Sequence, residues 1–211
     1  MIARSARSAA RSSALAAVLL CGSTWALAGG GPLGIDHQLS QSDTGIWSRN
    51  NQKALQVFAV AGDLGLALWE GGDSRLGRTA WQSVDSMSAA ALIANVMKPV
   101  FGRLRPSETD DPDQWRQGGR SFPSGEVATI AGIVTPYVLE YRQDQPAVWA
   151  LELLPLYDGI ARLKSRGHWQ TDVLAGWAIG TGTGWWAHAR DSPFVLGVLP
   201  HGVSVGFKKQ F

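Results

Sequence analysis

The sequence predicts an all-α protein, a helical bundle of about five or six core helices that ends in a short β-like tail. Successive segments from Gln52 onward carry apolar residues at the spacing of a helix face. Gly176, Gly180 and Gly184 recur every four residues, which gives one helix a smooth ridge for close packing. Apolar residues alternate with smaller ones only after Asp191, so a short strand is predicted there.

Composition bounds the class of protein. The 211 residues are enough for one domain with a sizeable core. The net charge of +2 is too small to indicate a nucleic-acid partner. The single cysteine, Cys21, cannot form an internal disulfide.

Residues 1–28 have the pattern of a secretory signal peptide, with a basic start, a short apolar run and small residues before a cleavage point. The basic residues are Arg4, Arg7 and Arg11, and the cleavage pattern is Ala26-Leu27-Ala28. We therefore expect export to a periplasm-like compartment. An uncleaved anchor helix and a lipoprotein attached through Cys21 are the alternatives.

Residues 29–51 are predicted to be an irregular lead-in, because they are rich in Gly, Ser, Asp and Asn. Residues 52–190 are predicted to form the helical domain. Its first helix covers Gln52 to Trp69 and is broken by Gly71 and Gly72. The second helix starts after Asp73 or Ser74 as its N-cap and runs to about Lys98.

A polar loop from Ser107 to Ser121 follows, and three further helices are predicted after it. The acidic residues of this loop could hold a divalent cation, but a solvated loop is the preferred interpretation. The helices cover Val127 to about Tyr141, Ala147 to about Leu163, and a last segment from near Asp172. Residues 191–211 form the predicted tail.

His168 and Asp172 are the first candidates for chemistry. They stand four residues apart, so on a helical turn they lie on one face within reach of each other. A carboxylate beside an imidazole orients the ring and stabilises its charged form, which makes His168 a candidate nucleophile or base. Arg162 carries a planar guanidinium suited to clamping an oxyanion. Taken alone, the stretch also fits an ordinary surface His-Asp pair.

Two earlier stretches offer ligands for the same anion. Lys98 and Arg105 are separated by six residues and precede Pro106. Ser124 offers a hydroxyl, and Gly125 lets the backbone approach a ligand closely. If a helix begins at Val127, the amides near Ser124 lie at its positive end. Together the three stretches predict a phosphate cradle that contains a nucleophile.

The three stretches resemble the signature motifs of the type 2 phosphatidic acid phosphatase superfamily, which also includes bacterial acid phosphatases and vanadium haloperoxidases. The family pattern is Lys, six residues, Arg-Pro; then Pro-Ser-Gly-His; then Ser-Arg, five residues, His, three residues, Asp. The match runs from Lys98 to Asp172, about a third of the chain. The resemblance implies the helical fold of these enzymes and a histidine phosphatase that needs no metal or cofactor. It implies that Lys98, Arg105, Ser124, Gly125 and Arg162 bind phosphate, that His168 is the nucleophile and that Asp172 supports it.

This sequence departs from the pattern at two positions. Ala161 replaces the serine before Arg162, and Glu126 replaces the histidine that protonates the leaving group. A free Glu has a pKa of about 4.3, so it holds almost no proton at neutral pH. Three outcomes stay open: Glu126 acts as a catalytic acid at low pH, the substrate has a good leaving group, or the enzyme is impaired.

The expected function is hydrolysis of a phosphate ester or a diphosphate through a phosphohistidine, with a lipid or prenyl diphosphate preferred. The alternatives are a catalytically impaired phosphate-binding protein and, less favoured, a vanadate-dependent haloperoxidase. The expected partners are a phosphorylated small molecule or lipid and a membrane surface. No predicted helix offers a charge-free run of about 20 apolar residues, so a soluble periplasmic or membrane-associated bundle is preferred to an integral protein with short spans. The ten tryptophans weigh the other way, because tryptophan favours membrane interfaces.

Overall fold

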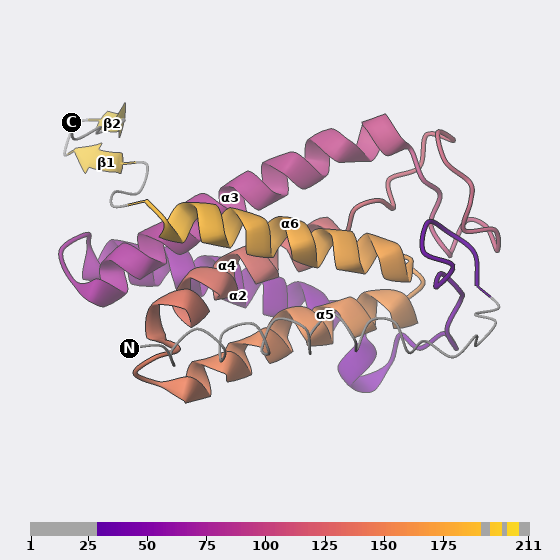
Figure 1. The fold of residues 1–211 in the computed structure, drawn as a ribbon, viewed down its shortest axis with the longest axis horizontal. Helices are drawn as coiled ribbons and strands as arrows, with labels where there is room; N and C mark the ends of the chain where they lie inside the picture. The colour runs from indigo at the N-terminus through magenta and orange to yellow at the C-terminus, as the bar shows by residue number, and fades with distance from the viewer. Residues whose placement is uncertain (1–28, 191–194, 200–201, 207–211) are drawn as a thin grey trace, which may run out of the picture.

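The computed structural model describes residues 29–190, 195–199 and 202–206, and it confirms the predicted all-α helical bundle. The predicted signal peptide lies outside the described residues. Five α-helices form the body of the bundle (Figure 1): α2 (Arg49–Glu70), α3 (Arg75–Phe101), α4 (Gly125–Tyr141), α5 (Leu153–Lys164) and α6 (Gln170–His188). Two 3-10 helices accompany them, η1 (Gly45–Trp47) and η2 (Pro146–Glu152).

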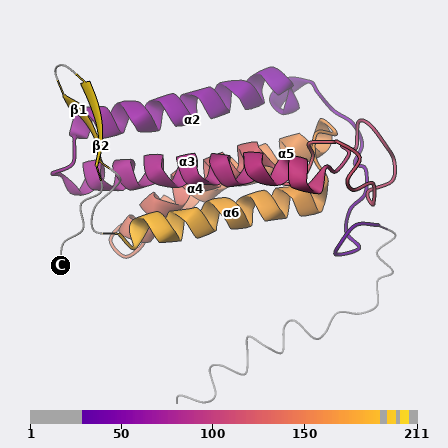
Figure 2. The same ribbon diagram turned by 90° about the horizontal axis from the view of Figure 1, so that it is seen from above.

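The five helices run alternately up and down, so one end of the bundle collects the starts of α2, α4 and α6 and the ends of α3 and α5. Figures 1 and 2 show this end on the right, where the lead-in and the loop between α3 and α4 also lie. Because the starts of helices carry partial positive charge, three such starts at one end favour an anion there.

Helix α4 is the centre of the bundle. Every residue from Val127 to Pro136 is buried, as expected for a helix that is covered all round. The predicted glycine ridge of α6 packs against it. A Cβ added at Gly176, Gly180 or Gly184 would lie 2.4, 2.3 or 2.4 Å from atoms of Ser124, Ala128 or Thr135. The three glycines therefore allow α6 to lie close enough to hold the two site segments together.

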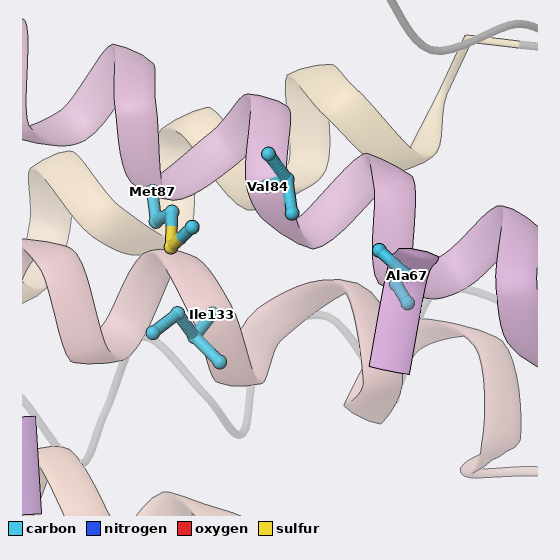
Figure 3. Packing of buried hydrophobic residues seen from close by; sticks show 5 residues of the cluster. Ala67, Val84, Met87 and Ile133 are labelled. Carbon is cyan, nitrogen blue, oxygen red and sulfur yellow. The ribbon is translucent and has the colours of Figure 1, made fainter. Parts of the chain in front are cut away.

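The far half of the bundle is held by an apolar cluster between α2, α3 and α4. Figure 3 shows its main members, Ala67, Val84, Met87 and Ile133. Val84 and Met87 lie on one face of α3, and Ile133 of α4 packs against that face. This packing fixes the angle at which α3 delivers its last turn to the opposite end.

The helix boundaries follow from local sequence signals. The Ser74 side chain accepts a hydrogen bond from the amide of Gly77, as predicted for an N-cap. Gly71 ends α2 with a φ of 69°, and Gly102 ends α3 in the left-handed region, with its amide donating to the carbonyl of Lys98. Helix α2 begins at Arg49, three residues earlier than predicted, because Ser48 caps it.

The C-terminal tail contains two strands where the sequence predicted one. β1 (Val195–Leu199) pairs antiparallel with β2 (Gly202–Gly206), and Val195 lies opposite Gly206. Among the helices described, none has the length and apolar character that crossing a membrane requires.

Candidate active site

The three predicted motif stretches meet at one cavity of about 310 Å³ at the end of the bundle where α2, α4 and α6 begin. Six of the eight predicted site residues line it, and Ser124 and Asp172 lie directly behind. The lining residues are Arg49, Gln56, Ala91, Asn95, Lys98, Arg105, Gly125, Glu126, Thr129, Arg162 and His168. Four cations and one carboxylate face the same space, so the cavity suits a multiply charged anion.

Lys98 reaches the cavity from the last turn of α3. Its Nζ donates to the carbonyl oxygens of Pro123 at 2.8 Å and Arg120 at 3.1 Å. Burial, reinforced by the charge of Arg105, lowers the pKa of Lys98 to about 8. The side chain is therefore held in place yet remains a cation at neutral pH.

The loop of residues 107–121 adds no side chain to this lining. Its backbone is instead tied to the end of α3, for example by the Ser121 amide donating to the Arg103 carbonyl at 2.9 Å. The loop contributes to the site from behind the lining, through the Arg120 carbonyl that holds Lys98 and the Ser121 hydroxyl that donates to Asp172.

Arg162 enters from the last turns of α5 and is 4% exposed. Its Nη1 lies 3.4 Å from the side-chain oxygen of Gln52, which is also buried. A Cβ at Gly167 would lie 2.1 Å from Nη2 of Arg162, so only glycine leaves room for the guanidinium. Burial lowers the pKa of Arg162, but a guanidinium stays charged throughout the range in which proteins work.

Ser124 and Gly125 form the start of α4. The Ser124 amide donates to the carbonyl of Asp172 at 2.9 Å, which joins the second and third motifs. The Ser124 hydroxyl is fully buried and has no hydrogen-bond partner among the described residues. A Cβ at Gly125 would meet neighbours at 3.7 Å, an ordinary contact, so packing does not require glycine there. Both features fit an oxyanion bound against the start of α4.

His168 lies in the turn before α6 and is 3% exposed. Its Nδ1 is 3.6 Å from Oδ2 of Asp172, slightly long for a hydrogen bond but close enough for a strong electrostatic contact. Burial lowers the pKa of His168 to about 4, although Asp172 opposes that change. The ring is therefore neutral at pH 7. With Nδ1 facing the carboxylate, Nε2 is the nitrogen left for a ligand.

Asp172 is anchored by a second layer of polar groups. Its Oδ2 also accepts hydrogen bonds from Ser121 Oγ at 2.5 Å and from the Trp169 amide at 2.9 Å. Its Oδ1 accepts one from Arg103 at 2.6 Å, and Arg103 is paired at 2.6 Å with Asp36 of the lead-in. The side chains of all three charged residues are fully buried. Because each charge has an opposite partner, the orientation of Asp172 is fixed.

Glu126 forms an ion pair that the sequence did not predict. Its two oxygens accept hydrogen bonds from the guanidinium of Arg49 at 2.7 and 2.5 Å, and Arg162 Nε lies 3.1 Å from Oε2. Burial raises the pKa of Glu126, but the hydrogen bonds from Arg49 and the charge of Arg162 outweigh it, so the pKa lies below its ordinary value. This geometry argues against Glu126 as a proton donor near neutral pH.

Sequence reasoning missed four residues that build the site: Asp36, Arg49, Gln52 and Arg103. Arg49 and Gln52 belong to the first turns of α2, just before or at its predicted start. Arg103 lies inside the first motif stretch, but nothing in the sequence distinguishes a buried arginine from a solvated one. The lone Asp36 is an ordinary lead-in residue until the fold brings it beside Arg103.

The described residues contain no cluster of three or more His, Cys, Asp or Glu side chains placed to hold a metal ion. The described side chains thus form a cation-lined cavity that also contains a neutral, buried imidazole.

Comparison with known proteins shows the family to which this chain belongs. The sequence profile of the PAP2 superfamily matches residues 79–193, more than half of the chain. The protein belongs to the PAP2 superfamily, as the motif resemblance predicted. The match begins inside α3, so Asp36, Arg49 and Gln52 lie before the matched region.

Curated relatives include two proteins named lipid A 1-phosphatase. The one from Porphyromonas gingivalis is 36% identical over 91 residues, covering 42% of this chain and 18% of the relative. The one from Rhizobium etli is 29% identical over 105 residues, covering 46% of this chain and 43% of the relative. The chain thus matches less than half the length of these relatives. The crystal structure of Aquifex aeolicus LpxE aligns with 72% of this chain and 100% of its own, with 19% identity and a TM-score of 0.39.

Proposed function

We propose that the protein is a phosphatase that hydrolyses a lipid-linked phosphate ester or diphosphate through a phosphohistidine on His168. The observation that carries this proposal is the cavity itself, in which four cations surround a neutral, buried imidazole oriented by Asp172. Such a ring has a free electron pair at neutral pH, and the cations can hold the equatorial oxygens of a phosphoryl group.

The reaction has two steps. In the first, the electron pair of His168 Nε2 attacks phosphorus, the bond from phosphorus to the leaving oxygen breaks, and that oxygen departs with the bonding pair. In the second, water attacks the phosphohistidine, the bond from phosphorus to nitrogen breaks, and the water proton passes to solvent. Lys98, Arg105, Arg162 and the start of α4 stabilise the charge that spreads over the oxygens in both steps.

Two observations support a lipid-linked substrate. The curated relatives are named as phosphatases of lipid A. In addition, large apolar side chains are exposed on α2 and α3 at positions that follow cavity-lining residues in sequence, and exposed apolar surface suits an apolar partner. They are Val57 and Phe58 on α2, 67% and 78% exposed, and Leu92 and Val96 on α3, 65% and 58% exposed. We further propose an exported enzyme that works at a membrane surface, in keeping with the signal-like pattern of residues 1–28.

A purified full-length chain in detergent micelles tests the proposal on lipid A, a prenyl diphosphate and a soluble aryl phosphate. We expect phosphate release from the lipid substrates, inhibition by vanadate, and loss of turnover in His168→Ala. A protein that binds vanadate but releases no phosphate would instead be a phosphate-binding protein. Halide oxidation on addition of vanadate would make it a haloperoxidase. Full activity of His168→Ala would exclude the phosphohistidine.

A further inference from the structure

At neutral pH the cavity holds no carboxylic acid and no imidazolium that could give a proton to the leaving oxygen. Glu126 is ionised because two guanidinium groups contact it. His168 is neutral, and its Nδ1 faces Asp172. The remaining charged groups of the lining are Arg49, Lys98, Arg105 and Arg162. A guanidinium donates hydrogen bonds but does not release its proton in this pH range. The ammonium of Lys98, whose pKa is about 8, is able to release a proton, but the carbonyl oxygens of Pro123 and Arg120 hold its Nζ in the buried part of the site. Help for a leaving group at the exposed part of the cavity therefore comes from a guanidinium.

The position of Arg49 distinguishes it from the other three cations. Arg162 and Lys98 are 4% and 9% exposed and lie deep in the site. Arg105 belongs to the loop after α3, on the side of the cavity where the Lys98 cation is held. Arg49 is supplied by α2, and its side chain is 32% exposed. The nucleophile His168 is buried, and an in-line displacement sends the leaving group away from it, toward the exposed part of the cavity.

Glu126 fixes the direction of the Arg49 side chain. The two groups meet in a bidentate pair, the most directional arrangement of a guanidinium and a carboxylate. Gln52 accepts a further hydrogen bond from Arg49 Nη1 at 3.2 Å, one turn along α2. A side chain with three such bonds is held ready before substrate arrives, which is what electrostatic stabilisation of a transition state needs.

We propose that Arg49 is a catalytic residue that stabilises the negative charge on the leaving oxygen, and that Glu126 is its positioning residue. This role rests on the proposed function. The leaving oxygen departs as an anion, hydrogen-bonded to Arg49, and takes its proton later from solvent. The pair thus replaces a proton donor by a fixed positive charge. The enzyme should therefore favour leaving groups that are stable as anions, as the phosphate released from a diphosphate is.

The test is a series of aryl phosphates whose phenols range from nitro-substituted to unsubstituted, in the full-length protein. The dependence of kcat/KM on the pKa of the phenol is measured for the wild type, Arg49→Ala and Arg49→Lys. We expect Arg49→Ala to lose about 100-fold on phenyl phosphate and less than about tenfold on the most activated ester. The line for Arg49→Ala should therefore be steeper. The line for Arg49→Lys, which keeps the charge, should have a slope between those of the wild type and Arg49→Ala.

Arg78→Ala is the matched control, because Arg78 is an exposed arginine near the opposite end of the bundle. It should reproduce the wild-type line. Parallel lines for the wild type and Arg49→Ala would overturn the role of Arg49, because a purely structural residue lowers all esters equally. If the wild type releases no phosphate from these esters or from the lipid substrates, the proposed function falls together with this role. The wild-type data alone therefore distinguish the failure of the proposed function from the failure of the role of Arg49.

Discussion

At the scale of single residues, burial disfavours the charged form of both the nucleophile and its cationic neighbour, with different consequences for activity. It lowers the pKa of His168 to about 4, which keeps the ring neutral and nucleophilic in mildly acidic solution. It lowers the pKa of Lys98 to about 8, which brings the loss of this cation close to the working range. Desolvation thus keeps His168 ready to attack and sets the highest pH at which Lys98 is still a cation.

These shifts predict a bell-shaped pH dependence of kcat/KM, a quantity that reports the free enzyme. Activity should fall below about pH 4, where His168 gains a proton, and above about pH 8, where Lys98 loses its own. In Lys98→Arg the alkaline limb should move beyond the accessible range, because a guanidinium does not titrate there. A phosphate ester itself titrates near pH 6. A change in kcat/KM near pH 6 that all variants share is therefore due to the substrate. An alkaline limb unchanged in Lys98→Arg would exclude Lys98 as its source.

At the scale of elements, the lead-in before α2 is part of the site although its sequence reads as irregular. The Asp36 side chain accepts hydrogen bonds from Arg103, from the Thr171 amide at 2.8 Å and from the Thr171 hydroxyl at 2.6 Å. The segment is thereby tied to the end of α3 and the start of α6. The first turns of α2 add Arg49 and Gln52. These segments complete a site whose core comes from the family-matched region.

The buried triad Asp36, Arg103 and Asp172 should be essential to stability as well as to activity. Arg103→Leu leaves two carboxylates buried without their cation, which should lower the free energy of unfolding by about 3–5 kcal/mol. Arg105→Leu is the control, because Arg105 is only two residues away but lines the cavity and is partly exposed. It should lose activity with little change in Tm. Equal Tm values for the two variants would contradict the structural role of Arg103.

The helices were predictable from local signals, whereas the site was predictable only in part. Apolar spacing, Ser74 and Gly71 located the first helices to within a few residues, and the glycine ridge of α6 identified a close helix contact. The motif pattern picked out residues that now line one cavity or lie directly behind it. Arg49 and Asp36 were missed because a partner far away in sequence defines their roles, and no periodicity encodes such a pair.

At the scale of the whole molecule, two buried groups make opposite contributions to the pH dependence of stability. Asp158 of α5 is fully buried, and neither of its oxygens has a hydrogen-bond partner among the described residues. Burial, assisted by the charge of Glu126, raises the pKa of Asp158 to about 7. The folded protein keeps a proton on Asp158 that the unfolded chain releases above about pH 3.9. Stability from this group therefore falls as the pH rises from about 4 to 7.

His168 has the opposite sign, because the unfolded chain binds a proton below about pH 6.5 and the folded site does so only below about pH 4. Stability from this group rises over that interval, so the two slopes, each at most about 1.4 kcal/mol per pH unit, largely cancel in the wild type. In Asp158→Asn only the contribution of His168 remains, so the free energy of unfolding should rise with pH between about 4 and 6.5. The substitution should also stabilise the protein near pH 8 by up to about 4 kcal/mol. Urea unfolding between pH 4.5 and 8 measures both effects. In His168→Gln only the contribution of Asp158 remains, so the free energy of unfolding should fall as the pH rises. A free energy of unfolding that does not change with pH in either single variant would show that neither group changes its proton affinity on folding.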